Sequence, residues 1–256
     1  MPRWSLAADG LGLISYHSQT NSDLKVLHCG TVTCTSGNTI TLADSGGFVG
    51  FYTSVTIGAD GLGLISDAEM YTLISPGRLR VLHCGDLTCS SGNTVTVVDN
   101  TSTDVGLYTS ITLGPDGLGL ISYFDAANRD LKVLHCGTAA CNSGNTITTL
   151  DSLNAVGEAT SITIGTDGLG LISYLDNTNG DLKVLHCGNA LCNSGNVTTA
   201  VDTAGDVGWH TSITLGTDGL ALIGHFDQMN SRSAGVSLRQ SDLHPAYARG
   251  TLRRMR

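Results

Sequence analysis

The chain repeats one unit of about 51 residues four times and starts it a fifth time. The tripeptide Asp-Gly-Leu marks the units, beginning at Asp9, Asp60, Asp116, Asp167 and Asp218. A fixed period in this range is the signature of a repeat architecture, in which each unit buries its apolar surface against its neighbours. The fold of one unit therefore decides the fold of the chain.

One unit contains four short segments with strand character. In the third copy they are residues 109–114, 118–125, 131–137 and 145–151, and turn sequences separate them. The second segment is apolar on both faces, as in a strand between two neighbouring sheets, and the fourth is rich in threonine. Four antiparallel strands per unit of this length predict an all-β propeller blade. An open stack of sheets is the alternative.

We expect a single propeller domain over residues 1–231, with four full blades and a partial fifth. The blades cover about residues 2–52, 53–108, 109–159, 160–210 and, in part, 211–231. The second copy departs from the pattern at 66–80. Residues 232–256 hold six arginines and one acidic residue without a strand period, which predicts a basic irregular tail. A further hypothesis is that the chain is a fragment of a longer propeller, whose unclosed edge favours self-association.

The repeat also resembles a known group. The run TSITIGTDGLGLISYLDNTNGDLKVLHCG at 160–188 is similar to the repeat of secreted bacterial β-propellers, loosely grouped with the sialidase-like propellers. The resemblance covers residues 2–231 and implies the propeller fold. It is specific for the repeat and not for an activity, because one fold hosts many functions.

Each full copy carries two cysteines with four residues between them. The pairs are Cys29/Cys34, Cys84/Cys89, Cys136/Cys141 and Cys187/Cys192. Local pairing in every copy predicts one disulfide per blade, and hence an extracellular or periplasmic protein, although no signal peptide is visible. Zinc is the alternative, but pairs a full blade apart do not converge on one ion. We predict neither a metal nor a cofactor.

A histidine precedes the first cysteine of each pair, at His28, His83, His135 and His186. Neighbouring strand residues point to opposite faces, so these histidines do not share a metal with the cysteines. We expect each ring to bond to the backbone of a neighbouring blade. The glycine that opens each second strand, as at Gly119, is expected to allow a close backbone approach near the propeller axis.

Two sets of loops are expected to share one rim of the propeller. The loops into the first strands carry four aromatic side chains that suit a sugar or a peptide, Tyr52, Tyr108, Trp209 and His210. A purely structural role, sealing the junctions between blades, is the alternative. The loops after the second strands supply Asp125 and Asp176 as further ligand-binding residues. Calcium would require a tighter alternation of acidic residues than these loops contain.

Charge and motif content limit the function. The net charge of −9 argues against nucleic acid and anionic membranes as partners, and no apolar run is long enough to insert into a membrane. Arg3, Arg78, Arg80 and Arg129 do not form the cluster that a sialidase needs, and acids that recur in every copy single out no catalytic pair. The sequence favours a non-enzymatic binding or scaffold module for a glycan or a protein. A sialidase-like glycoside hydrolase is the alternative.

Overall fold

The computed structural model describes residues 3–70, 77–101, 103–238 and 253–254. All regular secondary structure in these ranges is β-strand, arranged in five antiparallel sheets of four strands. Each sheet is a meander in which consecutive strands pair, so one sheet corresponds to one sequence repeat. The expected all-β propeller is confirmed.

The first sheet contains β1 (Arg3–Leu6), β2 (Gly12–Ser18), β3 (Asp23–His28) and β4 (Thr39–Asp44). The second contains β5 (Phe48–Ile57), β6 (Gly63–Met70), β7 (Gly77–His83) and β8 (Thr94–Asp99). The third contains β9 (Val105–Leu113), β10 (Gly119–Asp125), β11 (Asp130–His135) and β12 (Thr146–Asp151). The fourth contains β13 (Val156–Ile164), β14 (Gly170–Asp176), β15 (Asp181–His186) and β16 (Val197–Asp202). The fifth contains β17 (Trp209–Leu215), β18 (Ala221–Asp227), β19 (Arg232–Leu238) and the short β20 (Arg253–Arg254).

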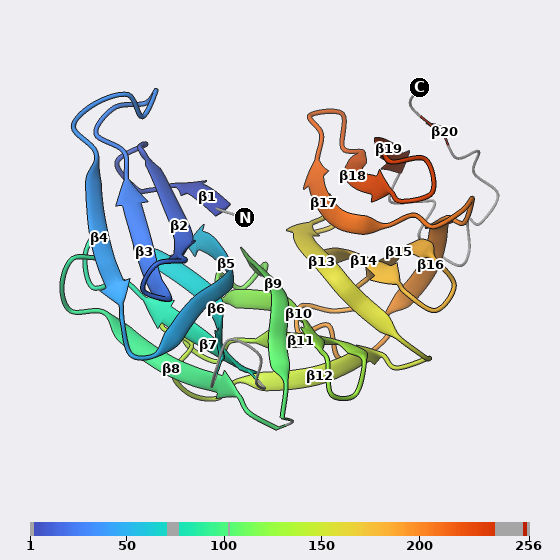
Figure 1. Cartoon of the computed structure of the whole chain (residues 1–256), viewed down its shortest axis with the longest axis horizontal. Coiled ribbons are helices and arrows are strands. Elements are labelled where there is room, and N and C mark those ends of the chain that lie inside the picture. Colours follow the sequence, from blue (N-terminus) through green and yellow to red (C-terminus); the bar gives the residue numbers. More distant parts are fainter. Residues whose placement is uncertain (1–2, 71–76, 102, 239–252, 255–256) are drawn as a thin grey trace.

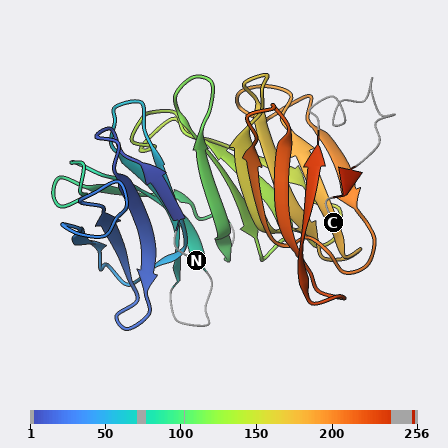
Figure 2. The same ribbon diagram turned by 90° about the horizontal axis from the view of Figure 1, so that it is seen from above.

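The five sheets follow one another around an arc in chain order (Figure 1). The first strand of each sheet lies towards the centre of the arc and the fourth towards its outside, as β9 and β12 show. Turning the molecule shows the sheets standing side by side (Figure 2). The first and fifth sheets stand at the two ends of the arc, and within the described ranges no strand of one pairs with a strand of the other.

Neighbouring sheets are held together by apolar clusters that repeat from junction to junction. At the junction of the third and fourth sheets, the third sheet contributes Leu120, Leu131 and Val133, and the fourth contributes Ile172 and Leu185. Burial of one aliphatic side chain stabilises a fold by about 1.5–3 kcal/mol. A blade therefore depends on its neighbour for much of its stability, as in other repeat architectures.

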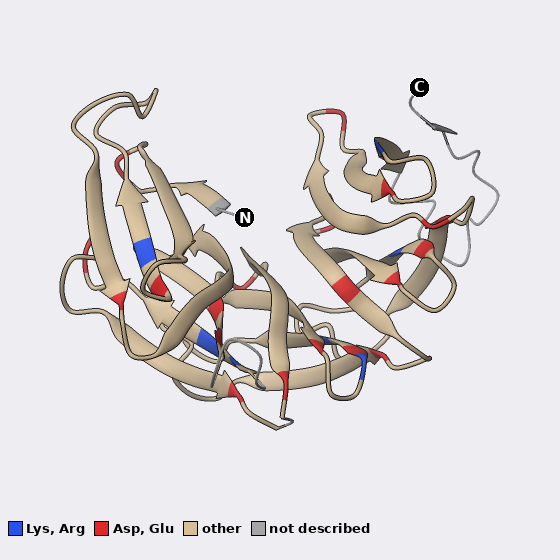
Figure 3. Cartoon of the chain, viewed as in Figure 1, with Lys and Arg blue, Asp and Glu red and all other residues tan. Residues whose placement is uncertain are grey.

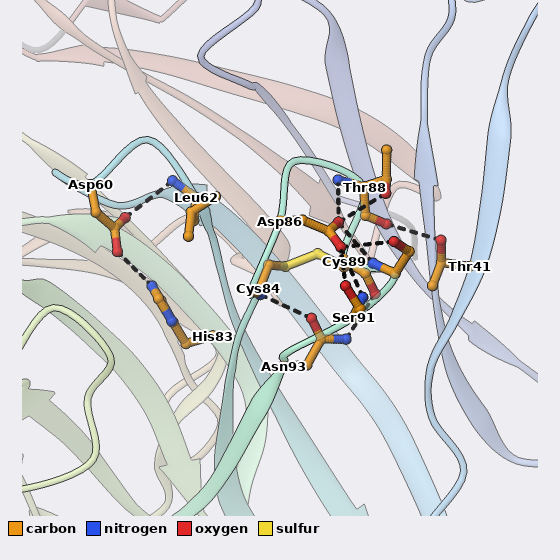
Figure 4. Close-up of a disulfide and its surroundings, with 12 residues drawn as sticks. Thr41, Asp60, Leu62, His83, Cys84, Asp86, Thr88, Cys89, Ser91 and Asn93 are labelled. Carbon is orange, nitrogen blue, oxygen red and sulfur yellow. Dashed lines mark hydrogen bonds and ion pairs between the residues drawn. A yellow bond between two sulfur atoms is a disulfide. The ribbon is translucent and has the colours of Figure 1, made fainter.

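Each full blade carries the disulfide that the cysteine spacing predicts. The bonds are Cys29–Cys34, Cys84–Cys89, Cys136–Cys141 and Cys187–Cys192. An asparagine at the same position of each full blade fixes the loop around the disulfide. In the second blade the Gly85 amide donates to Asn93 Oδ1 at 3.0 Å, and Asn93 Nδ2 donates to the Cys89 carbonyl at 2.8 Å (Figure 4). Four disulfides are typical of proteins that fold in an oxidising compartment.

The glycine that opens each second strand faces its own disulfide, and not a crowded axis as expected from the sequence. A Cβ at Gly119 would lie 2.8 Å from Cys136 Sγ and 3.0 Å from Leu64 Cδ2 of the preceding blade. The fifth sheet has no cysteine, and there the equivalent residue is Ala221. The small residue is thus required by the sulfur atom packed on it.

Gly119→Ala is therefore expected to lower the free energy of unfolding by about 1–3 kcal/mol, the usual effect of overpacking a core. Gly224→Ala is the matched control, because a Cβ at Gly224 meets no atom within 4 Å. In a strand, this control is expected to be neutral or to stabilise by about 0.5–1 kcal/mol. Urea unfolding followed by circular dichroism measures both. Equal stability of the two variants would contradict the packing argument.

The repeated histidines bond within their own blade, so the expected bond to a neighbouring backbone is wrong. His135 Nε2 lies 2.8 Å from Asp116 Oδ2, in the turn between the first two strands, and His83 makes the same contact with Asp60 at 2.7 Å (Figure 4). The other oxygen of Asp116 accepts the Leu118 amide at 3.1 Å. The aspartate of the Asp-Gly-Leu motif thus joins the turn to the end of the third strand.

The expected irregular tail begins as a strand. β19 pairs with β18 along its whole length, from Asp227↔Arg232 to Ala221↔Leu238, and Val236 and Leu238 are buried against the fourth sheet. The prediction of irregular structure is therefore wrong for residues 232–238, because the free edge of β18 satisfies their backbone despite an altered sequence. Residues 239–252 and 255–256, and residues 71–76 of the irregular second copy, lie outside the described residues.

Candidate functional site

One rim of the propeller is formed by the loops into the inner strands and by the turns between second and third strands. The Val156 amide donates to the Arg129 carbonyl of the preceding blade at 3.1 Å, and the Val207 amide donates to the Gly180 carbonyl at 2.9 Å. These bonds bring the two sets of loops together, as the sequence predicts. We name this end the bulge rim. The opposite end, with the disulfides and the Asp-Gly-Leu turns, is the disulfide rim.

Each inner strand of blades two to five is bulged where it reaches the bulge rim. In the fourth blade the pairing with β14 shifts between Val156 and Glu158 and again between Glu158 and Ser161. Gly157 has a φ of 97°, and a Cβ there would lie 2.7 Å from Leu131 Cα, so only glycine fits. Ala159 also has a positive φ, of 53°. Bulges redirect side chains and often lie beside functional sites.

The bulges explain why the inner strands begin earlier than the sequence indicates. β9, the inner strand of the third sheet, begins at Val105, whereas the expected boundary between the second and third blades lies at 108/109. Positive φ angles at Gly106 and Tyr108 break the strict alternation of side chains that is expected along a strand. The Val-Gly and Thr-Ser pairs that flank each bulge are the same in blades two to five. The pair of residues between them differs from blade to blade, although tyrosine is the second residue in both blade two and blade three.

These variable positions hold four different residue pairs on equivalent bulges. They are Phe51–Tyr52, Leu107–Tyr108, Glu158–Ala159 and Trp209–His210. The constant flanks keep the backbone geometry, so the chemistry of the rim can vary without loss of the fold. A repeat protein places specificity at the positions where its copies diverge, and the bulges are such positions.

Tyr52 and Tyr108 lie against each other at adjacent bulges. Their ring centroids are 4.6 Å apart and tilted by 51°, a favourable geometry for an aromatic pair, and Phe124 follows at 6.3 Å from Tyr108. Burial raises the pKa of Tyr108 to about 12, and the charge of Glu158 adds to the effect. Burial also raises the pKa of Tyr52, to which the charges of Asp104 and Glu158 contribute. The charge of Glu158 therefore acts on both tyrosines, and the charge of Asp104 acts on Tyr52.

Glu158 is the acidic residue of this cluster that sequence reasoning missed. The residue is half-buried on β13, and its Oε1 accepts a hydrogen bond from Asn177 Nδ2 at 3.1 Å. The equivalent positions of the other bulges hold Phe51, Leu107 and Trp209. The sequence shows a single acid among apolar equivalents here, but acids recur in every copy and this one does not stand out among them.

The other predicted ligand-binding residues divide into two groups. Trp209 and His210 lie on the fifth bulge, where Trp209 Nε1 donates to Asp206 Oδ1 at 2.8 Å and His210 is exposed. Asp125 and Asp176, by contrast, are buried. Asp125 Oδ2 lies 2.6 Å from Lys132 Nζ, and Asp176 makes the equivalent contact with its own blade's lysine at 2.7 Å. Each of these two carboxylates is thus paired with the lysine of its own blade.

Acidic residues outnumber lysine and arginine in the described blades (Figure 3). In the second blade Arg78 binds Glu69 through two hydrogen bonds of 2.8 and 3.0 Å, and Arg80 lies between Asp44 and Asp67. Within the described ranges, no group of three or more histidine, cysteine or acidic residues is arranged to hold a metal ion. Nor does any helix there have the length and apolarity needed to span a membrane.

The link between Glu158 and the tyrosine pair can be tested by titration. Glu158→Gln removes a negative charge, so the pKa of Tyr108 is expected to fall from about 12 towards its ordinary value of about 10. Phenolate absorbance measures the shift, and Tyr108→Phe identifies the signal. In the parent protein, Tyr108 supports stability fully below about pH 10 and loses that contribution as the pH rises to about 12, since the unfolded chain ionises first. An unchanged titration would separate Glu158 from the pair.

No protein-family model and no curated protein matches the sequence. Solved structures, however, resemble the whole chain. An α-L-arabinanase of Penicillium chrysogenum in complex with arabinobiose has a TM-score of 0.65 at 10% identity, covering 99% of this chain and 80% of its own. The family GH93 α-L-arabinofuranosidase of Fusarium graminearum, also with arabinobiose, has a TM-score of 0.62 at 11% identity, covering 93% and 80%. A thermostable family-43 glycoside hydrolase has a TM-score of 0.58 at 10% identity, covering 100% and 92%.

These comparisons establish the class of fold, a β-propeller like that of glycoside hydrolases of families 43 and 93. They correct the sequence-based expectation of a non-enzymatic binding or scaffold module, because the similar structures are carbohydrate-cleaving enzymes. The similar structures belong to families 43 and 93 and do not support the resemblance to sialidase-like propellers that the repeat suggests. At 10–11% sequence identity, the similarity establishes the fold alone.

Proposed function

We propose that the chain is a glycoside hydrolase whose active site is the cluster on the bulge rim around Glu158. The observation that carries the proposal is one acidic residue among apolar equivalents at the bulges, Glu158, whose charge acts on the Tyr52–Tyr108 pair, in a fold shared with arabinan-cleaving enzymes. Aromatic rings next to a carboxylate supply what a sugar needs, an apolar surface for the ring face and a group that exchanges protons.

Glycoside cleavage uses two carboxyl groups on either side of the scissile bond. We assign Glu158 as the general acid that protonates the leaving oxygen. Asp104 is the second carboxylate, because its charge and that of Glu158 both act on Tyr52. Asp104 lies at the start of the third bulge and accepts the Gly77 amide at 3.1 Å. Tyr52 and Tyr108 bind the sugar in this assignment, with Trp209 and His210 further along the rim.

The substrate class is a neutral glycoside. A sialoside requires cations for its carboxylate, and both Arg78 and Arg80 already bind acids of their own blade junction. The similar structures include complexes with arabinobiose and with xylotriose, which are neutral sugars. The disulfides support an extracellular or periplasmic location, where such polymers occur.

A panel of aryl glycosides tests the proposal. We expect release of the aryl group from an α-L-arabinofuranoside or a β-xyloside, and none from a sialoside. The same panel run with Asp104→Asn and with Asp218→Asn separates the bulge rim from the disulfide rim, because Asp218 lies in a turn of the disulfide rim. Turnover that survives in Asp104→Asn but disappears in Asp218→Asn would place the site on the disulfide rim and contradict the proposal. No turnover of any neutral glycoside would reject the proposal.

A further inference from the structure

The first sheet presents an apolar face that no described residue covers. Its cross-strand rows follow from the register: Trp4 pairs with Ile14, Ile14 with Leu27, and Leu27 with Ile40. We name the open face by its eight side chains, Trp4, Leu6, Ile14, Tyr16, Lys25, Leu27, Ile40 and Leu42. Trp4 is 69% exposed, whereas Ile111 and Ile162 at the equivalent positions of later sheets are each 6% exposed. An apolar surface of this kind marks an interaction site.

The inner junctions show what covers such a face. In the third and fourth sheets, the equivalent face packs against two leucines and a valine of the preceding blade, such as Leu120, Leu131 and Val133. The preceding blade also supplies an aspartate at the end of its fourth strand. Tyr174 Oη donates to Asp151 Oδ2 at 2.8 Å, and Tyr123 makes the same bond to its preceding blade at 2.7 Å.

The open face keeps the residues that make these contacts. Tyr16 stands at the position of Tyr123, and Lys25 at that of Lys132, which lies 3.9 Å from the aspartate of the preceding blade. Ser18 replaces Asp125, so Lys25 also lacks the carboxylate of its own sheet. Among the described residues, neither the Tyr16 hydroxyl nor the Lys25 ammonium group has a side-chain hydrogen-bond or ion-pair partner. An aspartate from outside the described sheets would pair with both.

The fifth sheet does not match the open face. Its outward side holds Leu222, Ser233 and Gly235 where the third sheet holds Leu120, Leu131 and Val133. A Cβ at the neighbouring Gly224 would meet no atom within 4 Å. A second copy offers only the same two ends, and two open faces placed together would bring Lys25 to Lys25 without a carboxylate. Neither end of the arc therefore completes the first sheet.

We propose that the open face is a docking surface for a further β-blade of this repeat type. The partner presents a Leu-x-Ser sequence on its second strand, a Leu-x-Val sequence on its third and an aspartate at the end of its fourth. Its leucines and valine cover the Trp4 and Ile14 rows, and its aspartate accepts from Tyr16 and Lys25. This inference is independent of the proposed hydrolase activity.

The chain itself supplies a blade with these features for the test. Arg3 pairs with Ser15 as Ser161 pairs with Ser173, so residues 105–160 fused directly before Arg3 place a copy of the third blade in the native register. Trp4 reports on docking once Trp209→Phe removes the other tryptophan. We expect blue-shifted Trp4 emission and a several-fold loss of acrylamide quenching, as exposure falls from 69% towards the 6% of Ile111.

Two controls keep the test decisive. Leu131→Ser with Val133→Gly in the added copy reproduces the outward side of the fifth sheet, and Trp4 should then remain quenchable. Tyr16→Phe should lower the melting temperature of the fusion more than that of the unfused chain, which a general packing defect would not do. The proposal is overturned if Trp4 in the fusion stays as quenchable as in the unfused chain. It is also overturned if the unfused chain protects Trp4 with rising concentration and sediments as a dimer, because the occupant of the open face would then be a second copy.

Discussion

Glu158→Gln is expected to lower kcat on a glycoside with a poor leaving group by about 10²–10⁴-fold, the usual contribution of a general acid. The amide keeps the size of the side chain and its contact with Asn177, so the fold should be retained. The loss should appear in kcat more than in KM, because the proton is transferred in the transition state and not in the bound ground state.

The leaving group distinguishes an acid from a merely structural carboxylate. A dinitrophenyl leaving group needs no proton, so Glu158→Gln should cleave such a glycoside at nearly the parental rate while failing on a methyl glycoside or a disaccharide. Asp218→Asn on the disulfide rim is the matched carboxylate-to-amide control and should change neither rate. An equal loss on good and poor leaving groups would remove Glu158 from the role of general acid.

The repeat made most of the fold accessible from the sequence, because each blade presents the same pattern several times. Strands two, three and four of the four full blades and all four disulfides lie where the spacing places them. The inner strands were placed less well, since the bulge at Tyr108 interrupts a period of two. β19 was missed because it relies on pairing with β18, which acts across the sheet and leaves no local signal.

The candidate site was accessible only in part. Tyr52, Tyr108, Trp209 and His210 were found because aromatic residues stand out beside constant Val-Gly and Thr-Ser pairs. Glu158 occupies the same kind of position, but an acid among many acids did not stand out. From the sequence, Asp125 and its equivalent Asp176 look like carboxylates that are free to bind a ligand. In the folded sheet, however, the register places Lys132 opposite Tyr123 and within reach of the Asp125 carboxylate. Whether a carboxylate is free to bind a ligand depends on its cross-strand neighbours, and these are known only once the register of the strands is known.

The second blade contains the contact whose loss should cost the most stability. Arg80 is buried, and its Nη2 lies 2.8 Å from Asp44 Oδ2 and 3.0 Å from Asp67 Oδ2. The same Asp67 oxygen accepts the Gly50 amide of the bulge at 2.7 Å. Removal of one partner from a buried ion pair leaves an uncompensated charge, so Arg80→Met is expected to lower the free energy of unfolding by about 3–5 kcal/mol. Urea unfolding of the purified variant measures the loss.

The repeat also provides the rescue. The third blade solves the same junction with Tyr123, Lys132 and Asp125, and its tyrosine donates to Asp99 of the preceding blade. Asp67→Tyr, Glu69→Asp and Arg80→Lys together copy that arrangement into the second blade, with Asp44 in the place of Asp99. The triple variant is expected to recover stability to within about 1 kcal/mol of the parent, because every buried charge again has a partner. If Arg80→Met alone were neutral, the junction would depend on apolar packing and the ion pair would be incidental. If the triple variant were as unstable as Arg80→Met, the junctions would not be interchangeable, and the packing rules read from one blade would not transfer to the next.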